Sequence, residues 1–113
     1  MTYEEALRRV KEREKFEDLE ILKLANDTGY TIAHSQANRG WTTEDLDILR
    51  LADAYGRTVA HRQASRGWTT EDLDIIRLAD EDGWTVAHRQ AWNGWEPKTR
   101  EAKIYVLTER LKE

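Results

Sequence analysis

The chain has 113 residues, of which 35% are charged, and a formal net charge of −4 at pH 7. This length fits one domain, residues 1–113, and the mildly acidic balance argues against a dedicated nucleic-acid binder. The absence of cysteine excludes disulfides and thiolate metal sites, and no apolar run reaches the roughly 18 residues of a membrane span. We expect a cytoplasmic protein without cofactor, a monomer or alternatively a dimer.

Residues 1–14 are predicted to form an N-terminal capping helix. Thr2 and Glu5 have the spacing of a capping box at a helix N-terminus. Ala6 and Val10 then lie four positions apart on one helical face. This segment aligns with the second helix of the repeats that follow. It is therefore expected to cover the first repeat, because the end of a stack of repeats needs one polar face.

The next part of the chain repeats one sequence, and its three copies are termed unit 1 (15–40), unit 2 (41–67) and unit 3 (68–94). Units 2 and 3 differ at six of their 27 positions, and unit 1 is a more diverged copy. A period of roughly 20–50 residues is typical of arrays and solenoids. Each unit is expected to contribute two helices to one stack.

In unit 3 the first helix is predicted to begin after Thr69 or Thr70, which are favourable N-cap residues, and to end at Gly83. The second is predicted to begin after Thr85 and to end at Gly94. A hydrophobic residue that follows a C-terminal glycine packs back on the last turn of the helix. This predicts a structural role for the tryptophans at that position, which are Trp41, Trp68 and Trp95.

Residues 95–113 are predicted to form a long C-terminal capping helix with Pro97 in its first turn. Trp92, near the end of unit 3, is expected to pack under this helix. The apolar side of the helix is expected to consist of Ala102, Ile104, Tyr105, Leu107 and Leu111. The chain is then an all-α helix-turn-helix repeat solenoid with about eight helices in four stacked pairs and no strand.

The stretch "DEDGWTVAH", residues 80–88, resembles the ankyrin repeat signature D-x-x-G-x-T-P-L-H. Asp80, Gly83, Thr85 and His88 match its fixed positions. The matches recur in unit 2 and, with Asn26 in place of the Asp, more loosely in unit 1. Ankyrin units have about 33 residues, and the segment that is missing here is the one that would form the projecting β-hairpin. The resemblance implies an ankyrin-like solenoid without hairpins that recognises proteins.

Three histidines stand in register in the units and raise the question of a metal site. Equivalent residues of stacked helices lie about 8–10 Å apart, whereas each ligand of a shared Zn²⁺ must lie about 2 Å from it. We therefore expect no metal, and a hydrogen bond from each His to the preceding Thr or to a neighbouring loop. The positions assigned a structural role with the tryptophans are Thr31, His34, Thr58, His61, Thr85 and His88.

Gln36, Gln63 and Gln90 also stand in register. A buried amide needs hydrogen-bond partners, so we expect these side chains to form a polar ladder from unit to unit. No motif for nucleophilic, phosphate-binding or metalloprotease chemistry occurs in the chain. The sequence therefore predicts a protein that is not an enzyme.

Positions that differ between units are the candidates for partner binding. Tyr30, Arg57 and Trp84 occupy one equivalent position, and Tyr55 lies in the adjacent turn. Tyr, Trp and Arg carry much of the binding energy at protein interfaces. We predict a non-enzymatic protein–protein interaction module, a small repeat-scaffold binder or inhibitor, with this strip as its contact surface. The acidic residues at the start of the first helix of each unit, such as Asp45 and Asp72, align along one edge of the stack. The alternatives are an engineered or recently duplicated scaffold without ligand, a basic partner on this acidic edge, and an RNA-binding helical repeat.

Overall fold

The computed structural model describes residues 1–109, and these residues form eight α-helices and no β-strand. The prediction of an all-helical chain is confirmed for this part of the sequence. Between the two terminal helices, helices of four and seven residues alternate. The helices are α1 (Tyr3–Lys11), α2 (Leu19–Leu22), α3 (Ile32–Asn38), α4 (Leu46–Leu49), α5 (Val59–Ser65), α6 (Leu73–Ile76), α7 (Val86–Trp92) and α8 (Arg100–Thr108).

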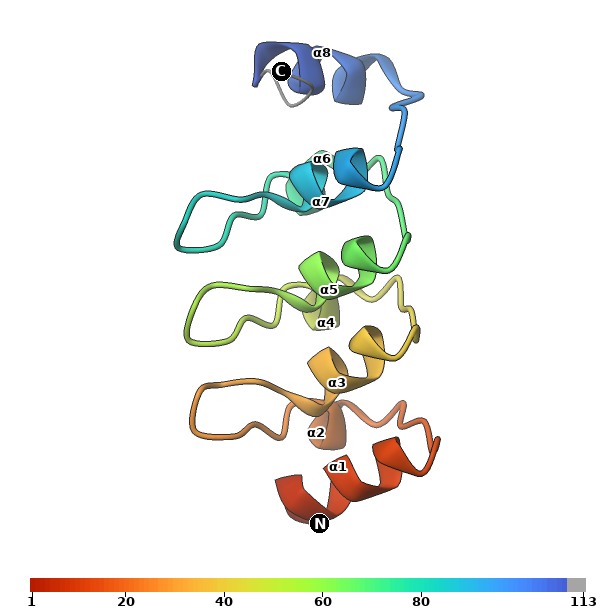
Figure 1. Cartoon of the computed structure of the whole chain (residues 1–113), viewed down its shortest axis with the longest axis vertical. Helices are drawn as coiled ribbons and strands as arrows, with labels where there is room; N and C mark the ends of the chain where they lie inside the picture. The colour runs from red at the N-terminus through yellow and green to blue at the C-terminus, as the bar shows by residue number, and fades with distance from the viewer. Residues whose placement is uncertain (110–113) are drawn as a thin grey trace.

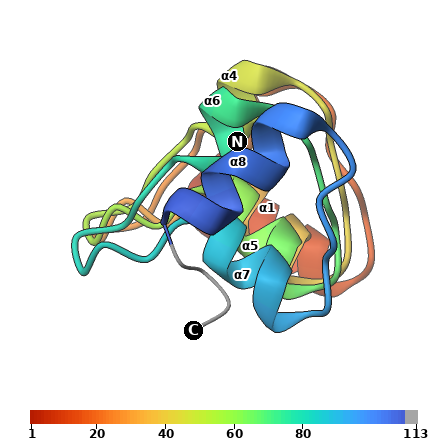
Figure 2. The ribbon, with the colours of Figure 1, turned by 90° about the horizontal axis from the view of Figure 1, so that it is seen from above.

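The helices lie in two rows along the long axis of the molecule (Figure 1). In one row α3 packs on α1, α5 on α3, and α7 on α5. In the other row α2, α4 and α6 each pack against the seven-residue helix that follows in the chain. Figure 2 shows α4 and α6 on the opposite side of the molecule from α5 and α7. The molecule is accordingly elongated, with principal extents of 44 × 23 × 20 Å.

The seven-residue helices begin and end at residues that the units share. α5 begins after Thr58, whose side-chain oxygen accepts a hydrogen bond from the His61 N–H. It is followed by Gly67, whose φ of 101° lies in the left-handed region that favours glycine. The Trp68 N–H then donates to the Gln63 carbonyl oxygen at 3.0 Å, the bond that closes a Schellman motif. These contacts make α5 a short, firmly terminated helix.

The four-residue helices are shorter than the sequence pattern predicts. The prediction that the first helix of unit 3 continues to Gly83 is wrong, because α6 ends at Ile76. Its N-cap is Asp72, whose side chain accepts from the Asp74 N–H. The predicted cap Thr70 lies before the helix, since its N–H and carbonyl group are both bonded to the side chain of Gln90 in α7.

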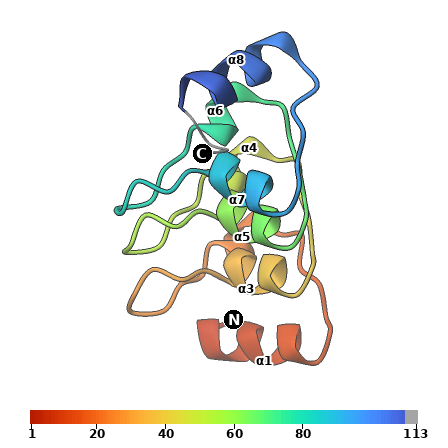
Figure 3. The ribbon, with the colours of Figure 1, turned by 45° about the horizontal axis from the view of Figure 1, so that its top comes forward.

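After each four-residue helix the chain runs out in a loop, and the three loops project to the same side (Figures 1 and 3). Each is closed by a single antiparallel β-bridge, such as the one between Ala52 and Thr58. Gly56 does not end a helix but occupies the turn of its loop with a φ of 77°. A Cβ at this position would lie 3.1 Å from the Asp80 Cα in the next loop, so only glycine allows this close packing. The projecting loops are residues 24–31, 51–58 and 78–85.

α8 covers the end of the molecule beside α6 and α7 (Figure 1). It begins after the N-cap Thr99, so the prediction that Pro97 lies in its first turn is wrong. The carboxylate of Glu71 accepts hydrogen bonds from the backbone N–H groups of Lys98 and Thr99, at 2.7 and 2.9 Å. These bonds fix the start of the last helix three residues later than the proline would place it.

Only one side of α8 is buried. Ala102 and Val106 pack into a core cluster with Ile76, Ala87 and Trp95. The predicted burial of two further apolar residues is wrong, because nothing in the described chain covers the outer side of α8. These residues are Ile104 and Leu107, which are 52% and 77% exposed; the fifth predicted residue, Leu111, lies outside the described residues.

Candidate partner-binding surface

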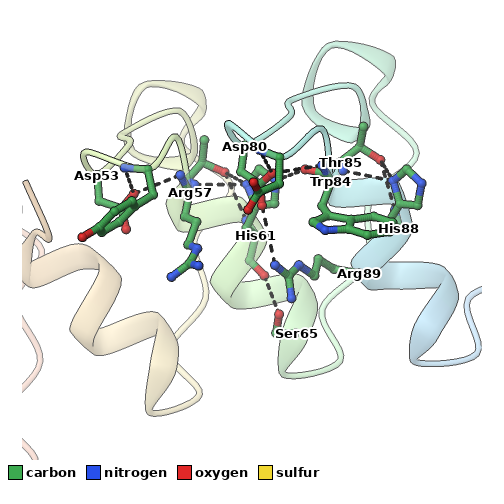
Figure 4. A network of polar contacts seen from close by, with 12 residues as sticks. Asp53, Arg57, His61, Ser65, Asp80, Trp84, Thr85, His88 and Arg89 are labelled. Atoms are coloured by element: carbon green, nitrogen blue, oxygen red, sulfur yellow. Dashed lines mark hydrogen bonds and ion pairs between the residues drawn. The ribbon is translucent and has the colours of Figure 1, made fainter.

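The Thr and His residues that the units share are bonded to each other in all three units (Figure 4). In units 1 and 2 the His is also bonded to the next unit. In unit 2 the His61 Nδ1 atom accepts a hydrogen bond from the Thr58 N–H at 3.1 Å and lies 2.7 Å from the Thr58 hydroxyl oxygen. A neutral imidazole that accepts at one nitrogen carries its proton on the other. The His61 Nε2–H therefore donates to the Trp84 carbonyl oxygen in unit 3, at 2.9 Å, and joins the two units.

Burial favours the neutral form of these histidines. The pKa of His61 is lowered from its ordinary value of 6.5, mainly because burial penalises the charged ring, although the bond to the Trp84 carbonyl acts in the opposite direction. The pKa of His34 is lowered for the same reason, against the effect of its bond to the Arg57 carbonyl. Within residues 1–109 no group of three or more His, Cys, Asp or Glu side chains is arranged to hold a metal ion.

The shared Gln residues hold the segments that precede the four-residue helices. The Gln63 side-chain oxygen accepts from the Thr43 N–H at 3.0 Å, and the Gln63 amide nitrogen donates to the Thr43 carbonyl at 3.2 Å. Both residues belong to unit 2, so the predicted ladder from unit to unit is wrong. A shared Trp makes such a contact instead, because Trp68 Nε1 of unit 3 donates to Glu44 Oε1 of unit 2 at 3.0 Å.

The residues predicted to bind a partner lie on or beside the projecting loops. Tyr55 and Trp84 are 46% and 44% exposed. The half-buried Arg57 places its guanidinium carbon 5.4 Å from the centre of the Tyr55 ring. Tyr30 is also half-buried, with the Arg62 guanidinium carbon 5.3 Å from its ring centre. The fold thus brings Tyr55 and Arg57 together and places Tyr30 and Trp84 in the loops on either side (Figure 3).

Trp92 does not pack under the last helix, and that prediction is wrong. Its side chain is 56% exposed, and its ring centre lies 5.3 Å from that of Trp84 and 6.1 Å from that of His88. The Arg89 guanidinium carbon lies 5.2 Å from the Trp92 ring centre. Trp84 and Trp92 therefore form one exposed aromatic cluster in unit 3. The exposure of Trp92 was predictable from the comparison of units, since units 1 and 2 have small polar residues at the equivalent position.

A hollow of about 230 Å³ lies where α5 meets α7, and it is termed the arginine hollow. It is lined by Arg57, His61, Arg62, Ser65 and Arg89, with no carboxylate among these lining residues. The comparison of units in the sequence did not join Arg57 to Arg62 and Arg89. That convergence depends on the bend of the chain from the loop into α5, which the repeat pattern does not specify.

Acidic residues gather on the other row of helices. Asp18, Asp45 and Asp72 are the N-caps of α2, α4 and α6, where the helix dipole favours negative charge. Since α4 and α6 lie on the opposite side of the molecule from α5 and α7 (Figure 2), these carboxylates are separated from the arginine hollow. The N-terminal ends of these helices are therefore acidic, whereas the arginine hollow is basic.

Comparison of the chain with protein families, with curated proteins and with solved structures found no match in any of the three. The ankyrin resemblance therefore stays a prediction from the sequence. No helix in the described part of the chain is both long and apolar enough to cross a membrane.

Proposed function

We propose that the chain is a non-enzymatic protein-recognition module, built as an ankyrin-like helical repeat solenoid, with its contact surface on the projecting loops. The observation that carries this proposal is that side chains shared by the units are buried, whereas several side chains that differ between the units are exposed. Shared residues such as His61 and Gln63 are buried and form internal hydrogen bonds. Unshared residues such as Tyr55 and Trp84 keep almost half of their surface exposed, and such residue types are favoured at interfaces.

The loops present these side chains on a fixed backbone. The Asp53 Oδ1 atom accepts hydrogen bonds from the N–H groups of Tyr55 and Arg57 at 2.9 and 3.0 Å. The Glu81 N–H of the next loop donates to the Tyr55 carbonyl oxygen at 3.0 Å. A surface that is ordered before binding loses less conformational entropy when a partner binds. This order favours recognition over a passive, mobile loop.

The test is the double substitution Tyr55→Ala and Trp84→Ala. Both residues make their loop hydrogen bonds through the backbone, so the fold is expected to survive while binding is lost. The matched control is Leu46→Ala, which removes a side chain of 44% exposure from α4, in the other row. The wild-type chain and the variants are used as bait in lysate of the source cells, and the captured partner is purified and titrated by calorimetry.

Capture by the wild type and the control but not by the double variant supports the proposed surface. Equal capture by all three chains would place the contact surface elsewhere. If the folded wild type captures nothing specific, the proposal fails, and a scaffold without ligand becomes the better description of the near-identical units.

A further inference from the structure

The arginine hollow contains cationic donors that the described residues do not satisfy. The Nε atoms of Arg62 and Arg89 are buried and form no hydrogen bond. The one ion pair of this group joins Arg89 Nη2 to Asp80 Oδ2 at 3.8 Å, a distance too long for a hydrogen bond. Arg57 and Arg62 have no carboxylate partner within residues 1–109. Such buried donors are costly for the free protein. A ligand anion can approach the exposed part of Arg62 and Arg89, whose half-buried side chains line the hollow.

Each of these arginines lies against an aromatic ring, and only Arg89 also pairs with a carboxylate, that of Asp80. Arg57, Arg62 and Arg89 each stack on a ring, those of Tyr55, Tyr30 and Trp92, at 5.2–5.4 Å from the guanidinium carbon to the ring centre. A ring over the face of a guanidinium leaves its outer N–H groups available to a carboxylate. Figure 4 shows the Arg57 and Arg89 side chains extending toward the side on which Ser65 lies.

The surroundings of the hollow favour a peptide ligand over a free inorganic anion. Trp84 and Trp92 lie beside Arg89 and leave exposed apolar surface, which a phosphate ion would not use but a neighbouring peptide side chain would bury. The acidic caps on the other row repel an acidic partner, so charge complementarity directs such a partner to the arginine hollow.

We propose that the arginine hollow binds carboxylate side chains of an acidic peptide segment, while Trp84 and Trp92 take an apolar side chain next to them. The carboxylates accept hydrogen bonds from Arg57, Arg62 and Arg89 and replace the solvent in the hollow. This inference rests on the proposed recognition function and names the chemistry of the partner.

The experiment titrates the full chain, labelled with ¹⁵N, with a blocked peptide of alternating Glu and Leu at low ionic strength. The same titration uses the matched Gln–Leu peptide, the Lys–Leu peptide and inorganic phosphate. The Glu–Leu peptide is expected to shift the Nε–Hε resonances of Arg62 and Arg89 and the indole resonances of Trp84 and Trp92. The shifts are expected to weaken steeply with added salt, because the attraction between charges is screened.

Variants separate the hollow from general charge effects. Arg62→Gln and Arg89→Gln are each expected to weaken the Glu–Leu peptide by about tenfold or more, the factor expected for a lost charge-assisted hydrogen bond. The control Arg50→Gln removes the same charge from an exposed position on the α4 row and is expected to leave the affinity within about twofold, as for a screened distant charge. Melting curves show whether each variant folds, and the resonance shifts of the wild type test the site even if a variant does not.

Equal binding of the Gln–Leu and Glu–Leu peptides would overturn the proposal, as would equal weakening by Arg50→Gln. Phosphate that shifts the arginine resonances while the Glu–Leu peptide binds no more tightly would show an anion site without peptide recognition, which also overturns it. Failure of the Glu–Leu peptide together with partner capture that depends on Tyr55 and Trp84 would refute the acidic ligand but leave the proposed function standing.

Discussion

Replacing His61 with alanine removes one side chain that completes the capping box of α5 and joins two units. The Thr58 N–H, which is buried, then has no acceptor, and the Trp84 carbonyl in unit 3 has no donor. A buried donor left unpaired costs about 1–3 kcal/mol, and a lost neutral hydrogen bond about 0.5–1.5 kcal/mol. We expect His61→Ala to lower the free energy of unfolding by about 2–4 kcal/mol, a large share of the total for a domain of this size.

His88 is the matched control within the same chain. Its Nδ1 atom accepts from the Thr85 N–H at 3.0 Å, just as in unit 2. Its ring is only partly buried, however, and no following unit offers its Nε2 atom a carbonyl oxygen within the described residues. Water can replace the lost acceptor there. We expect His88→Ala to cost about 1 kcal/mol, the usual effect of losing a helix cap.

Urea unfolding followed by far-ultraviolet circular dichroism measures both variants, at a pH well above the ordinary histidine pKa of 6.5. The difference between the two variants isolates the bond between units together with the burial of His61. Equal destabilisation by His61→Ala and His88→Ala, within about 0.5 kcal/mol, would refute the reasoning, since additive effects at separate sites agree to that level.

The remaining predictions test other bonds of the same kind. The pKa of His61 is lowered in the folded chain, so the unfolded chain binds the proton more tightly. The stabilisation from neutral His61 is therefore fully present above pH 6.5 and decreases as the pH is lowered further. We expect this decrease to be less steep in His61→Ala. Gln63→Leu leaves both backbone groups of Thr43 unpaired and is expected to cost about 2–4 kcal/mol in urea unfolding; an unchanged midpoint would contradict this. Glu71→Ala is expected to destabilise the chain more than Glu44→Ala, because Glu71 accepts from two backbone groups of the α8 start as well as from a Trp, and equal melting temperatures would exclude this role. Burial raises the pKa of Glu71, but these hydrogen bonds outweigh burial and hold the pKa below 4.5. The stabilisation from Glu71 is therefore present above pH 4.5 and is lost as the pH falls below that value. It is absent in Glu71→Ala at every pH.

The ends of the seven-residue helices are predictable because their signals are local. A Thr cap acts on a residue three positions away, as Thr58 does on His61, and a glycine with positive φ ends the helix beside it, as Gly67 does. Such short-range patterns are visible in the sequence without knowledge of the fold. The repeat is likewise visible in the sequence alone.

The length of the four-residue helices is not predictable in this way, because it depends on hydrogen bonds between residues 20 positions apart in the sequence. The segment from Thr69 onward has the composition of a longer helix, yet Gln90 in α7 binds both backbone groups of Thr70, and Asp72 caps the chain after it. At the other end Asp80 bonds to the N–H groups of Asp82 and Trp84, which turns the chain into a loop. The pattern D-x-x-G carries that second signal, since Asp favours such turns and glycine supplies the positive φ.

The candidate surface was predictable in part for a related reason. Comparison of the units separates shared from unshared residues, and this found Tyr55 and Trp84, which are exposed. It did not find the arginine hollow, because Arg57 comes from a loop while Arg62 and Arg89 come from two different helices. Convergence of that kind is set by the stacking of α5 on α7, and the repeat pattern does not contain it.

The bonds that join the units also explain how neighbouring loops can carry different side chains. His34 bonds to the carbonyl oxygen of Arg57, and His61 to that of Trp84. In both cases the acceptor is a backbone atom, which every residue type supplies equally. An Arg in one unit and a Trp in the next are therefore equivalent for stacking, although they differ completely as contact residues. The bonds that join the units come from shared side chains and the backbone, so the side chains at positions 57 and 84 can differ between units without loss of these bonds.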